Sequence, residues 1–108
     1  MPPVIWLLLA IGSEVVATSA LKASDGFTRL GPAVVVVVGY AASFYFLALT
    51  LRDIPLGVTY AVWSGIGTAA IAIIGVVFFR ETLGWVGIAG IVLIVLGVII
   101  LNLSGAHN

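Results

Sequence analysis

Four apolar segments, separated by short polar breaks, account for most of the chain. A helix that rises ~1.5 Å per residue needs about 20 residues to cross the ~30 Å hydrocarbon core of a bilayer. The segments have this length and run from about 4 to 21, 33 to 51, 57 to 79 and 84 to 103. Strands are disfavoured because Val34–Val38 is continuously apolar, whereas the strands of membrane barrels alternate in polarity. The pattern predicts an all-α membrane protein with four transmembrane helices in a single domain, 1–108.

Prolines precede the first two predicted helices, at Pro2-Pro3 and at Pro32. A proline is tolerated at the start of a helix because the N–H that it lacks would have no partner there. The first segment also contains the small residues Ala17–Ala20, a possible signal-peptidase site. However, no basic residue precedes this segment, and Glu14 interrupts it. We therefore expect it to be retained as a membrane helix.

The composition excludes several classes of function. Hydrophobic residues make up 63% of the chain and charged residues 7%, against roughly 25% charged in soluble domains. Four basic residues balance four acidic ones, so no basic patch is available for nucleic acid. The chain has no cysteine and no recognisable nucleophile–base pair or set of metal ligands. We expect no enzyme activity, cofactor or metal, and we interpret His107 as a solvated side chain.

The charged residues of the breaks specify the membrane orientation only weakly. The first and third breaks carry Lys22, Arg29 and Arg80, whereas the second carries Arg52. The positive-inside rule favours termini on the outer side by a difference of two residues. Insertion in both orientations is the alternative.

Glu14 is the candidate functional residue because it lies near the middle of the first apolar segment. A charged group at that depth costs from ~3 to more than ~10 kcal/mol, and such residues usually mark an ion or substrate pathway. Ala10 and Thr18 lie four residues away on the same helical face. These small neighbours leave room for a ligand. The alternative is that Ala10 and Ala17 let a neighbouring helix pack closely and that Glu14 only forms a hydrogen bond across that contact.

Aromatic side chains inside the second and third segments suggest what the carboxylate could bind. The second segment places Tyr40 and Ser43 on one face, and the third places Tyr60, Trp63 and Ser64 on one face. Aromatic faces combined with one carboxylate suit an organic cation. Packing between helices is the competing interpretation.

Two sets of glycines have separate expected roles. Gly65 and Gly67 follow Ser64 in the third segment and form a candidate hinge, with close helix packing as an equal alternative. Gly90 and Gly97 are seven residues apart and share a face of the fourth segment. They predict a helix–helix contact with a second copy, because four short helices make too thin a bundle to enclose a pocket.

The chain resembles the small multidrug resistance family over essentially its whole length. The resemblance rests on Ser13-Glu14-Val15-Val16-Ala17-Thr18, Leu21-Lys22, Gly26-Phe27-Thr28-Arg29-Leu30, Tyr40, Ala42-Ser43-Phe44, Ile54-Pro55, Tyr60-Ala61-Val62-Trp63-Ser64-Gly65-Ile66-Gly67 and Asn102-Leu103. Within the family, Tyr40 and Ala17 match the branch that exports lipophilic and quaternary ammonium cations better than the guanidinium branch. Ala17 differs from the tryptophan of the guanidinium branch, but it also differs from the glycine that is common in the first branch. Val4 and Tyr45 likewise depart from residues that occur in that first branch. These departures leave the substrate range open.

The resemblance implies an antiparallel homodimer of dual-topology subunits in the bacterial inner (cell) membrane, with two copies of Glu14 in one pocket. It implies proton-coupled antiport, with Tyr40, Tyr60 and Trp63 lining the site and Ala10, Thr18 and Ser43 nearby. It also matches Gly65 and Gly67 to a kink and Gly90 and Gly97 to the dimer contact.

Burial disfavours a charged carboxylate, and a second carboxylate nearby disfavours it further. Such a pair would hold either protons or a lipophilic cation. The alternatives are a guanidinium exporter of the same family, a membrane interaction subunit that transports nothing, and a channel.

Overall fold

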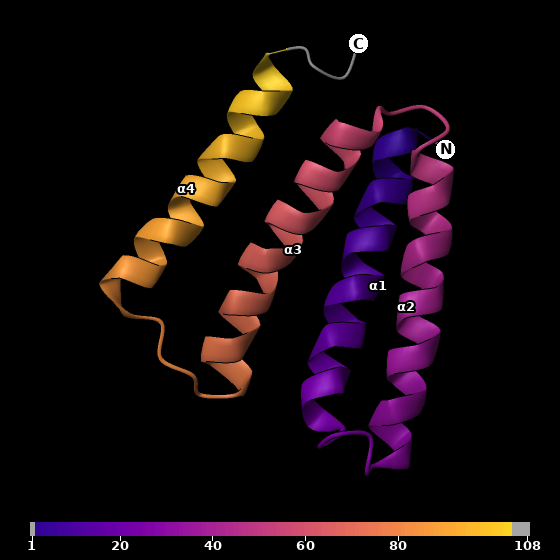
Figure 1. Ribbon diagram of the computed structural model, residues 1–108, viewed down its shortest axis with the longest axis vertical. Helices are drawn as coiled ribbons and strands as arrows, with labels where there is room; N and C mark the ends of the chain where they lie inside the picture. The colour runs from indigo at the N-terminus through magenta and orange to yellow at the C-terminus, as the bar shows by residue number, and fades with distance from the viewer. Residues whose placement is uncertain (1, 105–108) are drawn as a thin grey trace. The chain divides into compact units, whose positions relative to one another are not determined.

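The computed structural model describes residues 2–104, in which four helices follow one another (Figure 1). They are α1 (Pro3–Ala23), α2 (Leu30–Thr50), α3 (Leu56–Phe78) and α4 (Gly84–Leu103). All four are long and apolar enough to cross a membrane. The prediction of an all-α membrane protein with four spans is confirmed. His107 lies outside the described residues.

The helix boundaries differ from the expected ones mainly at α2, which begins at Leu30 rather than near residue 33. Pro32 therefore lies within the first turn of the helix. It is tolerated there because the first N–H groups of a helix have no acceptor inside it. Arg29 is the extended residue before the helix, and its carbonyl accepts a hydrogen bond from the N–H of Ala33 at 3.1 Å.

The connection between α1 and α2 is organised by Ser24, which is completely buried. Its hydroxyl donates to the carbonyl of Leu21 at 2.8 Å and accepts from the N–H of Phe27 at 3.1 Å. The chain then reverses through three consecutive residues with positive φ, Asp25, Gly26 and Phe27. Gly26 adopts this conformation without steric cost, as expected of a turn glycine.

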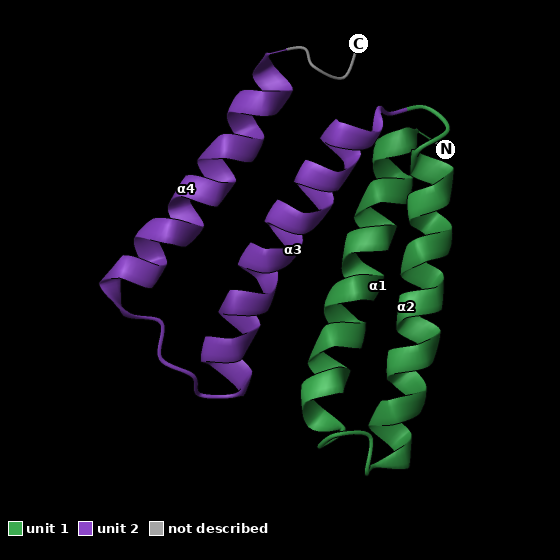
Figure 2. Cartoon of the chain, viewed as in Figure 1, with its two compact units in different colours: residues 1–53 green, residues 54–108 purple. Residues whose placement is uncertain are grey.

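The contacts within the chain divide it into two compact units, 1–53 with α1 and α2, and 54–108 with α3 and α4 (Figure 2). That the four helices form one domain stays a prediction.

Small residues allow α1 and α2 to pack closely in the first unit. A Cβ atom added to Gly39 would lie 2.8 Å from the Cβ of Ala17 and 3.2 Å from the carbonyl oxygen of Ser13. Nearer the start of α1, the rings of Trp6 and Phe46 stack with their centroids 5.8 Å apart. Glycine against alanine thus sets the separation of the two helices around the middle of the pair.

In the second unit α3 packs against α4 through Gly65, where an added Cβ atom would lie 2.7 Å from a methyl group of Val98 and 3.3 Å from one of Ile94. At the end of α3 the carbonyl of Gly75 accepts hydrogen bonds from the N–H groups of Phe79 and Glu81. No residue of α4 is buried. This helix is therefore the one most available for contact with lipid or with another protein chain.

Candidate functional site

Glu14 lies in the middle of α1 and is half-buried. Its Oε1 atom accepts a hydrogen bond from the hydroxyl of Thr18 at 2.9 Å. Its Oε2 atom is buried and has no hydrogen-bond partner among residues 2–104. A buried polar atom without a partner costs roughly 1–3 kcal/mol, and more when it carries charge. The carboxyl group therefore has one hydrogen-bonded oxygen and one without a partner, and a proton or a cation could neutralise its charge.

Thr18 connects Glu14 to α2. It lies one turn after Glu14, and its hydroxyl is 2.6 Å from the hydroxyl of Tyr40. The structure thus brings together three of the residues that the sequence singled out, and it orders them as Glu14, Thr18 and Tyr40. The sequence placed Tyr40 on a face of α2 without indicating that a threonine would join it to the carboxylate.

Ala10 and Ser43 occupy a different place in the same unit. Both are completely buried, and the Ser43 hydroxyl donates to the carbonyl of Ala10 at 2.8 Å. In this structure they form part of the contact between α1 and α2. For Ala10 this is the close-packing role that the sequence left open as an alternative. A direct role of either residue in lining a pocket stays a prediction.

The predicted residues of α3 form a second group. The rings of Tyr60 and Trp63 lie with their centroids 5.6 Å apart and their planes tilted by 47°. The hydroxyl of Ser64 donates to the carbonyl of Tyr60 at 2.7 Å, so it is engaged with its own helix. Tyr60 is 58% exposed, which leaves much of its ring available to another molecule. That this group and Glu14 share one pocket stays a prediction.

The glycines of α3 and α4 differ in their surroundings. Gly65 and Gly67 are buried, and α3 is a continuous helix across them. Gly65 serves the packing of α4, and its role as a hinge stays a prediction. A Cβ atom added at Gly90 or Gly97 would meet nothing within 4 Å. Both positions are therefore sterically open, as a contact with a second copy requires.

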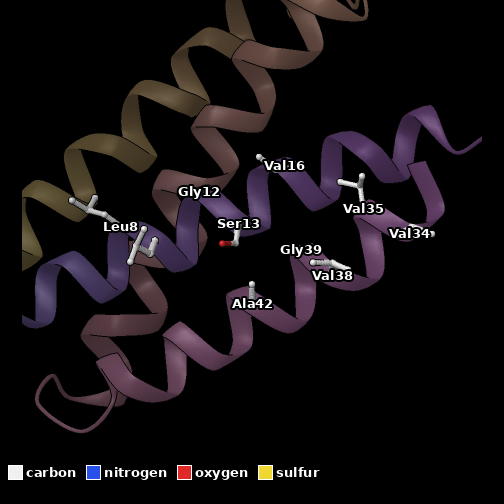
Figure 3. Close-up of a pocket in the computed structure, with 10 residues that line it drawn as sticks. Leu8, Gly12, Ser13, Val16, Val34, Val35, Val38, Gly39 and Ala42 are labelled. Carbon is white, nitrogen blue, oxygen red and sulfur yellow. The ribbon is translucent and has the colours of Figure 1, made fainter. Parts of the chain in front are cut away.

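The structure also shows an apolar groove between α1 and α2 that the sequence did not predict (Figure 3). Its volume is about 710 Å³, and its lining residues are Leu8, Leu9, Gly12, Ser13, Val16, Val34, Val35, Val38, Gly39 and Ala42. Glu14 is not among them, so the groove follows another face of α1. Small residues on both helices, such as Gly12 and Gly39, could have indicated a groove. The register of α1 against α2, which decides where these residues meet, could not be read from their spacing in the sequence.

Within residues 2–104 no three His, Cys, Asp or Glu side chains gather in a way that could hold an ion. Glu14 presents one carboxyl group beside the hydroxyl of Thr18, which in turn contacts the hydroxyl of Tyr40.

The model of the Small Multidrug Resistance protein family matches residues 3–94. This chain belongs to that family. The match covers Glu14 on α1, Tyr40 on α2, and Tyr60 and Trp63 on α3. It also covers Gly90 but ends before Gly97. The four apolar helices and the family place the chain in the bacterial inner membrane as a multi-pass protein.

Relatives of this family member are similar over nearly their whole length. The multidrug resistance protein EbrA of Bacillus licheniformis is 54% identical over 100 residues, which cover 93% of this chain and 95% of the relative. The quaternary ammonium compound-resistance protein QacE of Escherichia coli is 52% identical, with 95% and 96% covered. The quaternary ammonium compound-resistance protein QacH of Staphylococcus saprophyticus is 40% identical, with 98% and 99% covered. The family is one of transporters, which are not enzymes.

Proposed function

We propose that this protein is a proton-coupled antiporter that exports lipophilic and quaternary ammonium cations across the cell membrane. Protons and the cation compete for Glu14, and the working form is an antiparallel homodimer in which two copies of Glu14 share one pocket. The names of the relatives support the class of substrate.

The observation that carries the proposal is the buried, unpartnered Oε2 atom of Glu14. A carboxylate in a low-dielectric site is strongly disfavoured unless its charge is neutralised. A proton neutralises it by forming a covalent bond, and a lipophilic cation neutralises it by lying beside it. The two cannot neutralise the same charge at once, so binding of one releases the other.

The aromatic residues supply the second requirement for binding an organic cation. The ring of Tyr40 is held near Glu14 through Thr18, and Tyr60 and Trp63 lie side by side on α3. Ring faces attract a desolvated cation by ~2 kcal/mol or more each. They are also tolerant of shape, which suits a site that accepts several cations. In the proposed pocket, Tyr40, Tyr60 and Trp63 line the site that contains the carboxylate of Glu14.

Exclusive occupancy becomes antiport if the pocket opens to only one side of the membrane at a time. An antiparallel dimer makes the two open states equivalent by symmetry, because the two subunits exchange conformations. The charge difference between the loops, with Lys22, Arg29 and Arg80 against Arg52, is small enough to permit insertion in both orientations. Insertion in both orientations supplies the two oppositely oriented subunits that an antiparallel dimer requires.

Binding of tetraphenylphosphonium measured against pH tests the proposal. We expect the affinity to fall as the pH is lowered, by up to about tenfold per pH unit for each proton displaced. Isothermal titration in two buffers of different ionisation enthalpy would count the protons released. Binding that is tight and independent of pH would contradict the proposal. Proton release caused by guanidinium but not by tetraphenylphosphonium would assign the chain to the guanidinium branch of the family.

The proposed dimer contact makes a separate prediction. Replacing Gly90 or Gly97 by valine should lower the dimer fraction by at least about tenfold while leaving the helix content unchanged, because each position is open within the chain. Cross-linking in membranes would measure the fraction. Gly12→Val is a control, since Gly12 is equally open but lies on α1. A dimer fraction that is unchanged in both α4 variants would place the contact elsewhere.

A further inference from the structure

The hydrogen bonds between Glu14, Thr18 and Tyr40 have a direction. A hydroxyl group has one hydrogen to donate, and an ionised carboxylate can only accept. When Glu14 is ionised, the Thr18 hydroxyl therefore donates its hydrogen to Oε1 of Glu14, at 2.9 Å. The bond of 2.6 Å between Thr18 and Tyr40 must then be donated by Tyr40. With Glu14 charged, the Tyr40 hydrogen thus points to Thr18, and the lone pairs of the Tyr40 oxygen are left for other partners.

Protonation of Glu14 changes this order. A proton on Oε2 would be a buried donor without an acceptor among residues 2–104, and unpaired buried donors are rarer than unpaired buried acceptors. A proton on Oε1 instead has the Thr18 oxygen within reach. Glu14 then donates to Thr18, Thr18 donates to Tyr40, and the hydrogen of Tyr40 is released from Thr18.

We propose that Thr18 is a positioning residue that reverses the hydrogen bond to Tyr40 when Glu14 takes up a proton. This inference rests on the proposed function, because it assumes that the proton and the substrate compete at Glu14. In the ionised state the Tyr40 oxygen turns a lone pair toward a cation. In the protonated state Tyr40 turns the positive end of its O–H bond away from Thr18, where it repels a cation. The tyrosine therefore adds to the exclusion of substrate from a protonated site.

Glu14, Thr18 and Tyr40 all belong to the first unit, the helix pair of α1 and α2. The other charged side chains of that unit lie at the ends of α1 and α2 or in the adjoining loops. They are Lys22, Asp25, Arg29, Arg52 and Asp53. Within the proposal, Glu14 is the group that takes up the proton, and Thr18 connects it to Tyr40.

A double-mutant cycle tests the relay, with the pH midpoint of tetraphenylphosphonium binding as its measurement. Thr18→Val removes the donor to ionised Glu14 and should raise the midpoint by about one to two pH units. Thr18→Ser keeps the hydroxyl and should restore the original midpoint. Tyr40→Phe should shift the midpoint in the original protein but not in the Thr18→Val background. Equal shifts by Tyr40→Phe in both backgrounds would overturn the proposal.

A spectroscopic measurement does not depend on how well Thr18→Val folds. Ultraviolet resonance Raman bands of tyrosine report whether the hydroxyl donates or accepts a hydrogen bond. The difference between the original protein and Tyr40→Phe isolates Tyr40, which should change from donor to acceptor as the pH falls through the midpoint. A constant signal would overturn the relay. If the binding itself were independent of pH, the proposed function would fail instead.

Discussion

Glu14→Gln should abolish the release of protons when tetraphenylphosphonium is added, and it should weaken binding of that cation by at least about 30-fold. Glutamine has nearly the shape of glutamic acid but carries no titratable group. Removing one partner of a buried charge pair costs ~2–5 kcal/mol, and 1.4 kcal/mol corresponds to a factor of ten. Titration calorimetry and a pH electrode in weakly buffered detergent solution would measure the two effects.

Glu81→Gln is the matched control for this experiment. Glu81 carries the same functional group but is exposed, in the connection between α3 and α4. We expect this variant to release protons on binding as the original protein does. Release that persists in Glu14→Gln, or that disappears in Glu81→Gln, would move the site of competition away from α1.

Gly39→Ala should destabilise the first unit by about 1–3 kcal/mol, the usual cost of overpacking a close contact. The added methyl group would lie 2.8 Å from the Cβ of Ala17 and 3.2 Å from its Cα. Both are atoms that only a movement of α1 can displace. Unfolding of the purified protein in sodium dodecyl sulfate, followed by circular dichroism, would measure the loss. Because Thr18 follows Ala17 directly, pushing the two helices apart at Ala17 should also weaken the hydrogen bond between Thr18 and Tyr40.

Gly12→Ala is the control for the packing effect. It makes the same chemical change in the middle of a transmembrane helix, at a position where the added atom meets nothing within 4 Å. Alanine has the better helix propensity, by up to ~1 kcal/mol, so this variant should be as stable as the original protein or slightly more so. Equal losses in the two variants would show that the contact between Gly39 and Ala17 does not limit stability.

The groove between α1 and α2 and the hydrogen-bonded trio use different faces of the same helix pair. The groove is apolar and does not include Glu14 among its lining residues. The trio contains a carboxyl group and two hydroxyl groups. A helix turns by about 100° per residue, so Gly12 and Val16 face away from Glu14. One pair of helices can therefore present apolar surface on one side and a polar site on another.

The sequence by itself determined the four membrane spans and singled out Glu14 as the candidate functional residue. Hydrophobicity is a property of each residue, and the thickness of the bilayer sets the length of a span. A single carboxylate near the middle of such a span therefore stands out without any knowledge of packing. The family resemblance could also be read from the spacing of its motifs, and the family match confirms it.

The tertiary structure alone decided which side chains meet. It joined Tyr40 to Glu14 through Thr18, left Oε2 of Glu14 unpartnered among the described residues, and placed Ser43 on the carbonyl of Ala10. Helical spacing gives the residues that share a face of one helix. The rotation and register of two helices depend on how closely their backbones approach, which Gly39 and Ala17 set here. That approach is a property of the packed pair, so neither segment alone reveals it.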